Sequence, residues 1–303
     1  MKVIRSISDL RSLLSNSGNQ TIGYVPTMGF FHEGHLSLMN AAREETDIVV
    51  TSVFVNPLQF GPNEDFEQYP RNEKRDIKLA ENSGVDILSA PDVNTMYAHK
   101  ASISMNVTGR ADVLCGRSRP GHFDGVVTVL SKFFNMIQPD KVYFGMKDAQ
   151  QVAVVAGLIT DLNFPIELIG IPTVREVSGL AKSSRNVHLS QDEILEAQWL
   201  YRALTNGKKL VAEGEKDPAM IIATVTETIH HHTAGIIDYV ELLSYPDLQE
   251  VEMINGQVIL AIAVKFNQAR LIDNLIFDKS GQVGGNLYVS HNDESEDSSC
   301  TGN

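Results

Sequence analysis

The chain has 303 residues with 25 Lys+Arg against 38 Asp+Glu, a formal net charge of −13, and two cysteines. That length suffices for one large or two modest domains, and the acidic balance argues against a nucleic-acid or anionic-membrane binder, since both are held through Lys and Arg. Two cysteines far apart in sequence form neither a disulfide framework nor a metal cluster, and the apolar stretches are too short to span a bilayer, so we expect a soluble cytoplasmic protein.

In the first part of the chain, short apolar runs alternate with amphipathic segments. This alternation indicates an α/β fold, a Rossmann-like parallel sheet with right-handed crossovers. Sites in such sheets lie beyond the carboxyl ends of the strands, so the segments that follow strands are the candidates for function. The predicted strands are 22–25, 47–55, 85–88, 142–144 and 166–171, and the predicted helices are 33–45, 71–83, 126–137 and 149–162.

From about residue 174 the order changes to helices followed by strands. Helices are predicted at 191–213 and 218–232, and strands at 239–243, 258–264 and 270–277. This pattern favours a smaller α+β domain. We therefore divide the chain into a nucleotide-binding domain at 1–173, a C-terminal lid domain at 174–277 and a tail at 278–303. The tail holds five acids and one lysine, and we expect it to be disordered.

The segment after the first strand carries the most specific pattern, Pro26-Thr27-Met28-Gly29-Phe30-Phe31-His32-Glu33-Gly34-His35. Two histidines three residues apart at a helix start share one face, and the helix N-terminus adds N–H donors suited to phosphate. A zinc protease is disfavoured because its motif spaces the histidines by four. A pair of histidines that only caps the helix is the favoured reading if the segment is taken alone.

Three further segments hold polar side chains. Asn56 and Gln59 follow the second strand and offer neutral donors and acceptors for hydroxyls and carboxylates, although Asn-Pro alone indicates only a turn. Gly145–Gln151 leads from strand to helix, and there Lys147 can meet phosphate oxygens. Taken alone, an Asp148 cap beside a solvated lysine is more common. Lys182-Ser183-Ser184-Arg185 fits a polyphosphate clamp, with a solvated loop at even odds.

The P-loop and dinucleotide-binding fingerprints are absent from the sequence. No Ser-His-acid or Cys-His pair is indicated for covalent catalysis. The residues alone therefore predict a nucleotide-dependent enzyme that works by positioning and charge stabilisation.

Taken in order, these motifs make the chain resemble the pantothenate synthetase (pantoate–β-alanine ligase) family, from the first strand to Asn274. The motifs are PTMGFFHEGHLSL, VFVNPLQF, YPR, RPGHFDGV, FGMKDAQQ and PTVREVSGLAKSSRN. The H-x-G-H element is shared with nucleotidyltransferases and class I aminoacyl-tRNA synthetases, so the resemblance implies the HxGH nucleotidyltransferase type of fold. It also implies a homodimer formed through the larger domain.

The resemblance implies a ligation in two steps, in which pantoate attacks the α-phosphate of Mg-ATP and the amine of β-alanine then displaces AMP from the pantoyl adenylate. It implies catalytic roles for His35, His32 and Lys147. The implied ATP-binding residues are Met28, Gly29, His32, Gly34, His35, Gly145, Met146, Lys147, Asp148, Val174, Lys182, Ser183, Ser184 and Arg185. Gln59, Gln151 and Asn56 are implied for pantoate and β-alanine. Magnesium would be held mainly by ATP oxygens, without a protein metal site.

Three positions depart from the common family pattern: Met146, Ala149 and Lys182. The extra cation at Lys182 predicts slightly stronger phosphate binding. The main rival function is a nucleotidyltransferase that moves AMP or CMP onto a phosphate ester, and the neutral Gln59 and Gln151 favour the ligase over it. A second rival is a catalytically dead nucleotide-binding regulator. The smaller domain is expected to close over ATP.

Overall fold

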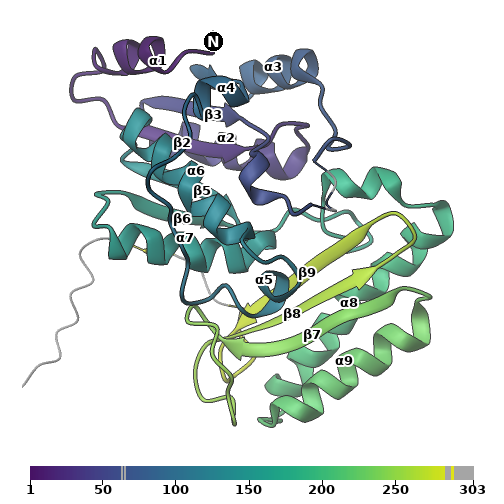
Figure 1. The fold of residues 1–303 in the computed structure, drawn as a ribbon. Helices are drawn as coiled ribbons and strands as arrows, with labels where there is room; N and C mark the ends of the chain where they lie inside the picture. The colour runs from purple at the N-terminus through teal and green to yellow at the C-terminus, as the bar shows by residue number, and fades with distance from the viewer. Residues whose placement is uncertain (63, 65, 284–287, 290–303) are drawn as a thin grey trace, which may run out of the picture.

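A sheet of seven strands forms the centre of the larger domain in the computed structural model (Figure 1). The structure describes residues 1–62, 64, 66–283 and 288–289. Neighbouring strands are parallel except at the β6 edge, where the last strand runs antiparallel. The order across the sheet is β1 (Lys2–Ile4), β4 (Ile87–Ser89), β3 (Ile48–Val53), β2 (Ile22–Thr27), β5 (Lys141–Gly145), β6 (Glu167–Ile171) and β10 (Tyr288–Val289).

The strand order reverses between β2 and β5. From β2 the chain proceeds to β3 and β4 on one side, whereas β5 continues to β6 on the other. The crossovers therefore leave in opposite directions and open a crevice beyond the carboxyl ends of β2 and β5, which is where such sheets bind ligands. The segments that follow these two strands are the H-x-G-H motif and Gly145–Gln151.

Helices cover both faces of this sheet, and each face has its own apolar core. Helices α1 (Ile7–Leu14), α6 (His122–Ile137) and α7 (Ala149–Asp161) pack on one face. Helices α2 (Glu33–Glu45) and α3 (Glu73–Asn82) pack on the other. Most of α6 and α7 is apolar and buried, as expected for helices laid along a parallel sheet.

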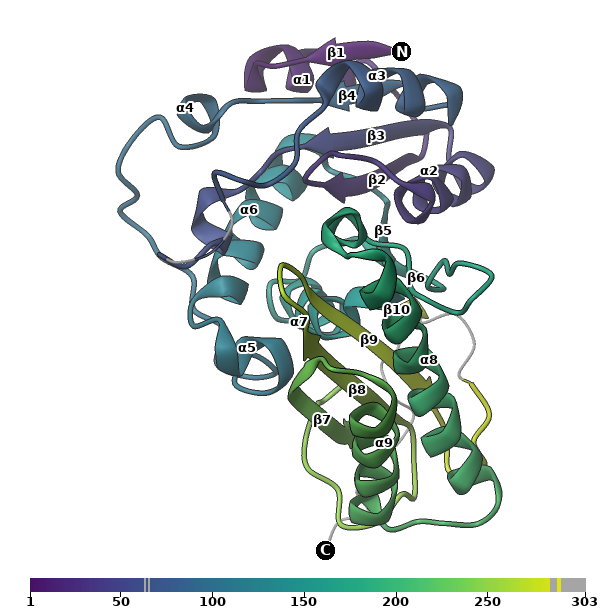
Figure 2. The same ribbon diagram turned by 90° about the vertical axis from the view of Figure 1, so that its right-hand side faces the viewer.

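The C-terminal domain is a three-stranded antiparallel sheet of β7 (Ile236–Ser244), β8 (Val258–Lys265) and β9 (Arg270–Phe277). Helices α8 (Gln191–Ala212) and α9 (Pro218–His232) cover one face. The other face is turned toward α5 (Leu114–Ser118) and α7 of the larger domain (Figure 2). Strand β8 is therefore buried on both sides, with Leu260 and Ile262 toward the helices and Ile259, Ala261 and Ala263 toward the larger domain.

The predicted fold class is confirmed, and the long predicted helices and strands are present with shifts of a few residues at their ends. Strand β1, helix α1, the one-turn helices α4 (Val93–Met96) and α5, and the short helices η1 (Pro57–Gln59), η2 (Met146–Asp148) and η3 (Ser184–His188) were not predicted. The strand and the helices of one turn are too short to show a hydrophobic period. Helix α1 does show one, with Leu10 and Leu14 buried on one side, and the prediction missed it.

The sequence placed a disordered tail at 278–303, and only part of that tail lies within the described residues. In that part, Gln282 and Gly281 bond back to Asp278, and Tyr288–Val289 pair with Leu168 and Ile169 of β6 as strand β10. The strand at 288–289 thus lies inside the segment expected to be disordered. Residues 284–287 and 290–303 lie outside the described residues.

Candidate active site

Two adjoining cavities open at the reversal of strand order. The smaller has a volume of about 240 Å³ and lies over the ends of β2 and β5; the larger, about 700 Å³, lies between the two domains. Both are lined by the same set of polar side chains, so these residues form a common wall. The shared residues are Arg119, His122, Lys147, Asp148, Gln151, Ser183 and Arg185.

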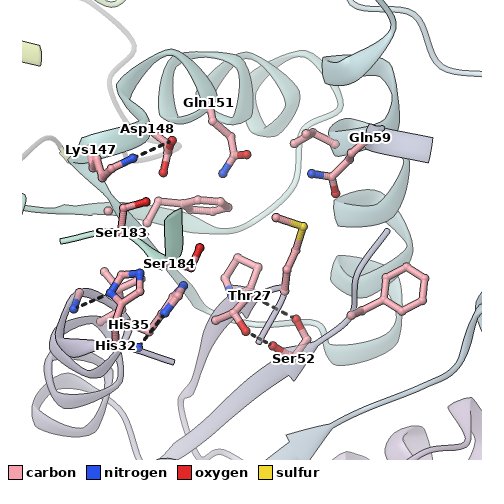
Figure 3. Close-up of a pocket in the computed structure, with 18 of the residues that line it drawn as sticks. Thr27, His32, His35, Ser52, Gln59, Lys147, Asp148, Gln151, Ser183 and Ser184 are labelled. Atoms are coloured by element: carbon pink, nitrogen blue, oxygen red, sulfur yellow. Dashed lines mark hydrogen bonds and ion pairs between the residues drawn. The ribbon is translucent and has the colours of Figure 1, made fainter. Parts of the chain in front are cut away.

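His32 and His35 stand at the first turn of α2 and complete its N-terminal cap. Nδ1 of His32 accepts a hydrogen bond from the N–H of Gly34 (3.1 Å), and Nδ1 of His35 accepts one from the N–H of His32 (3.3 Å). Because a backbone N–H only donates, the neutral rings carry their hydrogen on Nε2. The ring centroids lie 4.1 Å apart, and both side chains line the smaller cavity (Figure 3). The histidines therefore cap the helix and also present two Nε2–H donors.

Both imidazoles are neutral at pH 7. Burial lowers the pKa of His32 to about 4, and the positive charge of Lys147 lowers it further. Burial lowers the pKa of His35 to about 3, with additional contributions from His32 and Lys147. The two rings thus act as hydrogen-bond donors, and Lys147 supplies the positive charge on this side of the cavity.

The turn between β2 and α2 is held by Asp76 of α3. Its carboxylate, 1% exposed, accepts hydrogen bonds from the N–H groups of Phe30 (2.7 Å) and Phe31 (2.8 Å). Phe30 and Gly29 have φ angles of 53° and 84°, in the left-handed region. A Cβ at Gly29 would lie 2.9 Å from Cγ1 of Val53, so only glycine fits without a shift. Sequence reasoning missed Asp76 because it stands mid-helix in a charged stretch and belongs to no motif.

Lys147 approaches from the end of β5, opposite the histidines. Its Nζ lies 3.9 Å from Oδ1 of Asp148. Ser183 and Ser184, from the segment between β6 and α8, lie between Lys147 and the histidines in Figure 3. Donors from three separate parts of the chain thus surround one space, which suits a polyphosphate better than a single-charged ligand.

Lys182 is held by carboxylates from two elements. Its Nζ lies 2.6 Å from Oε1 of Glu176 and 3.5 Å from Oε1 of Glu33, and the hydrogen bond to Glu176 raises the pKa of the lysine. Glu176 belongs to a short hairpin closed by the Arg175–Ala181 bridge, and Glu33 begins α2. The lysine therefore ties the hairpin to the helix, and part of its charge is already compensated.

The amides of Gln59 and Gln151 line the other end of the smaller cavity (Figure 3). Gln59 is oriented by Asn56, whose Nδ2 donates to Oε1 of Gln59 (3.0 Å) and to the carbonyl of Gly125 (3.0 Å). Asn56 is completely buried, and its Oδ1 accepts from the hydroxyl of Tyr97 (2.8 Å). Asn56, expected at the substrate, therefore stands behind Gln59 and fixes that side chain, leaving the Nε2 of Gln59 as a donor.

Gly125 lets helix α6 approach this loop. A Cβ at Gly125 would lie 2.3 Å from the carbonyl oxygen of Leu58 and 2.8 Å from the backbone nitrogen of Gln59. Any other residue would collide with backbone, which has little freedom to move away. The position of Gln59 thus depends on Gly125, which lies 66 residues later in the chain.

Arg119 and His122 bind the loop from the α6 side. Arg119 pairs with the carboxylate of Glu64 through Nε (2.9 Å) and Nη2 (2.5 Å). His122 donates from Nδ1 to the carbonyl of Gln59 (2.8 Å), and its Nε2 accepts from Arg119 (3.2 Å). Burial lowers the pKa of His122 to about 4, so this ring is also neutral. In the sequence both residues lie in the RPGHFDGV motif, which is part of the family resemblance.

Most of the predicted site residues meet at these cavities. Three of them do not line either cavity: Gly29 shapes the turn, Asn56 supports Gln59, and Met146 packs partly buried against apolar clusters. Among the described residues, no group of three or more His, Cys, Asp or Glu side chains is placed to hold a metal ion. The predicted site residues that do line the cavities are Met28, His32, Gly34, His35, Gln59, Gly145, Lys147, Asp148, Gln151, Val174, Lys182, Ser183, Ser184 and Arg185.

Comparison with known proteins decides which chemistry this geometry serves. A family model described as pantoate-beta-alanine ligase matches residues 2–276. The chain belongs to the pantoate–β-alanine ligase family. Its activity is therefore that of a ligase that joins pantoate to β-alanine.

Individual relatives agree with this family across nearly the whole chain. Pantothenate synthetase from Geobacillus kaustophilus (strain HTA426) is 57% identical over 288 residues, 94% of this chain and 96% of the relative. The Bacillus subtilis (strain 168) enzyme is 56% identical over 280 residues, 92% and 98% of the two chains. The crystal structure of pantoate-β-alanine ligase (pantothenate synthetase) from Thermus thermophilus gives a TM-score of 0.87 at 41% identity, covering 91% of this chain and 99% of that one.

A second solved structure includes ligands. The pantoate-β-alanine ligase from Francisella tularensis, described as complexed with β-γ ATP and β-alanine, gives a TM-score of 0.74 at 32% identity. The match covers 92% of this chain and 98% of that chain. The regulator without catalytic activity, considered above, is excluded by this family membership.

Proposed function

We propose that this ligase activates pantoate with ATP at the smaller cavity and passes the adenylate to β-alanine there. One observation carries the proposal: His32, His35 and Lys147 converge on one space at the reversal of strand order, beside the neutral amides of Gln59 and Gln151. The likeness to a relative described as complexed with β-γ ATP and β-alanine supports both ligands. The residue roles below are part of the proposal.

In the first step, a carboxylate oxygen of pantoate attacks the α-phosphorus of ATP, and the bond to the bridging oxygen breaks to release pyrophosphate. Negative charge on the α-phosphate oxygens grows in the transition state. The Nε2–H groups of His32 and His35 donate to these oxygens, while Lys147 and the N-terminus of α2 stabilise the charge. Ser183, Ser184 and Arg185 hold the phosphates that leave.

Pantoate fits the deep end of the smaller cavity. Its carboxylate and hydroxyls require polar partners, which Gln59 and Gln151 supply without charge. Its two methyl groups require an apolar wall, which side chains such as Val126, Leu130 and Phe133 supply. Neutral amides favour this small hydroxy acid over a phosphorylated acceptor, because they do not compensate two negative charges.

In the second step, the neutral amine of β-alanine attacks the carbonyl carbon of the adenylate, and AMP leaves with the pair of electrons of the broken C–O bond. The nitrogen gives up one proton to solvent as the amide forms. The amine reaches the carbonyl from the larger cavity, which shares Lys147 and Gln151 with the smaller one. The smaller domain covers this space and limits the access of water to the adenylate. Its apolar face is packed against α5 and α7, and its closure over ATP stays a prediction.

Magnesium neutralises part of the triphosphate charge when it is bound with ATP. Such an ion keeps several of its waters and binds mainly phosphate oxygens, so it needs few ligands from the protein. Asp148 is the carboxylate suited to contribute to such a site, since it borders both cavities beside Lys147.

Exchange of labelled pyrophosphate into ATP tests the adenylate. We expect exchange that requires pantoate and proceeds without β-alanine. Exchange that requires a phosphate ester instead would support the rival nucleotidyltransferase, and release of phosphate instead of pyrophosphate would replace the adenylate by an acyl phosphate.

Two broader features are also proposed: a homodimer formed through the larger domain, and a cytoplasmic location. Resemblance to the family supports the dimer, and the cysteine content supports the location. Among the described residues, none of the helices has the length and apolar character needed to cross a bilayer. Light scattering on the protein as it elutes from a size-exclusion column tests the dimer, since a mass near 33.4 kDa would show a monomer.

A further inference from the structure

Asn274, on strand β9 of the smaller domain, reaches into the larger domain and holds the loop that carries Lys147. Its Nδ2 donates to the carbonyl of Met146 (3.0 Å) and to the carbonyl of Lys147 (2.9 Å). Asn274 is 8% exposed. Both hydrogens of the side-chain amide are thus committed to two successive carbonyls, which fixes the backbone from which the Lys147 side chain extends.

Its neighbour Asp273 holds the second segment that faces the nucleotide. The carboxylate, 4% exposed, accepts a bidentate pair of hydrogen bonds from Arg175 at 2.6 and 2.8 Å. Arg175 also donates to the carbonyl of Gly179 (3.1 Å), and its guanidinium lies 3.9 Å from the ring centre of Tyr201. Asp273 thereby anchors the hairpin that leads directly to Lys182-Ser183-Ser184-Arg185.

The pleat of β9 allows two successive residues to hold both the Lys147 loop and the hairpin. Asn274 pairs with Ala261, which faces the larger domain, and Asp273 pairs with Ile262, which faces α8 and α9. Successive side chains of a strand point to opposite faces. The two residues also bond to each other, since Oδ1 of Asp273 accepts the backbone N–H of Asn274 (2.8 Å).

We propose that Asp273 and Asn274 are positioning residues for ATP, which set Lys147 and the 182–185 segment at the correct separation for the phosphates. One arm of the nucleotide site lies in the crossover after β5 and the other in the segment between β6 and α8. Strand β9 bonds to the first arm and to the hairpin that leads into the second. This inference rests on the proposed role of Lys147 at the phosphates. It makes the smaller domain part of the nucleotide site, in addition to covering it.

The decisive variant is Asn274→Asp, which keeps the shape of the side chain but turns an oxygen toward two carbonyl oxygens. We expect the affinity for ATP, measured by calorimetry, to fall about tenfold from the loss of two hydrogen bonds, with no change in the affinity for adenosine, which has no phosphate. In a Lys147→Met background, the same substitution should have less than about a twofold further effect on ATP. Asn274→Ala serves if the aspartate variant does not fold.

Tyr245→Phe is the matched control. The hydroxyl of Tyr245 also crosses between the domains, but it donates to the carbonyl of Ala149, the first residue of α7 (3.2 Å), and not to the carbonyls of Met146 and Lys147 that Asn274 holds. We expect its ATP affinity to stay within about twofold of that of the unaltered protein. Equal weakening in Tyr245→Phe and Asn274→Asp would show a general effect of interdomain bonding and would overturn the inference.

Asp273→Asn tests the second arm. Its loss of ATP affinity should add to that of Lys147→Met, because the two substitutions act on different segments. It should not add to that of Arg185→Gln, which acts on the same segment. Equal loss of adenosine and ATP binding in the Asp273 or Asn274 variants would show only a defect of folding and overturn the inference. Unchanged ATP binding in Lys147→Met would instead overturn the proposed role of Lys147 in the function, and with it the premise of the inference.

Discussion

His32 and His35 each use one ring nitrogen for the helix and leave the other for a ligand, so capping and catalysis can be separated by choosing the replacement. Asparagine is a good N-cap, and glutamine at the third helical position can bond back to the cap N–H. We therefore expect His32→Asn and His35→Gln to fold with nearly unchanged free energy of unfolding but to lose pyrophosphate exchange by at least about a hundredfold. His32→Ala should in addition lose about 1 kcal/mol of stability.

Thermal unfolding and the exchange assay, run on the same preparations, check this prediction. Full exchange activity in the Asn and Gln variants would mean that the histidines serve α2 alone. That simpler reading was open from the sequence, since the spacing of the two histidines fits a cap as well as a site. In the structure both side chains cap α2 and also line the smaller cavity, and their role in catalysis stays a prediction.

At the scale of elements, the hairpin at 175–181 approaches the start of α2 through Lys182. The sequence predicts that this extra cation strengthens phosphate binding, but Glu176 and Glu33 already hold it. We expect Lys182→Met to weaken ATP binding by only about two- to threefold. Glu176→Gln should tighten ATP binding in the presence of Lys182 and have no effect in the Lys182→Met background. Calorimetry on the unaltered protein, the two single variants and the double variant measures these affinities for ATP. Unchanged or tighter ATP binding in Lys182→Met contradicts the prediction.

The alternation of apolar strands and helices was sufficient to predict the larger sheet, because parallel strands buried on both faces are continuous apolar runs. The motifs after β2 and β5 located the site for the same reason: topology puts the ends of neighbouring strands together. Asp76 and Asn274 could not be found in this way. Each contacts its partners through a bond to backbone atoms of a distant segment, and no local pattern of residues encodes such a bond.

At the scale of the whole molecule, three buried neutral histidines predict how stability depends on pH. The folded pKa values are about 4 for His32 and His122 and about 3 for His35, all lower than in an unfolded chain. Between these values and about 6.5, only the unfolded state is protonated. The free energy of unfolding therefore falls as the pH drops through this window, by up to about 1.4 kcal/mol per pH unit for each histidine.

Denaturant unfolding at several pH values between 4.5 and about 7.5 measures how the free energy of unfolding depends on pH. The upper limit of this range lies above the ordinary histidine pKa of about 6.5. His122→Gln should reduce this dependence by the share of one histidine. Stability that does not vary over this range would contradict the burial of the three rings as neutral groups. The −13 net charge adds a background that is common to the unaltered protein and to His122→Gln, so the comparison isolates the histidine.

The contact between Gly125 and the Leu58–Gln59 backbone also bears on how this enzyme can be altered to accept other acids. Redesign of a pocket usually begins with the side chains that line it, but here the wall around Gln59 is set from behind by a position that has no side chain at all. Enlarging position 125 would displace the loop as a unit, so selectivity for the acid would change before the binding of nucleotide does. The shape of this wall is therefore open to engineering from α6.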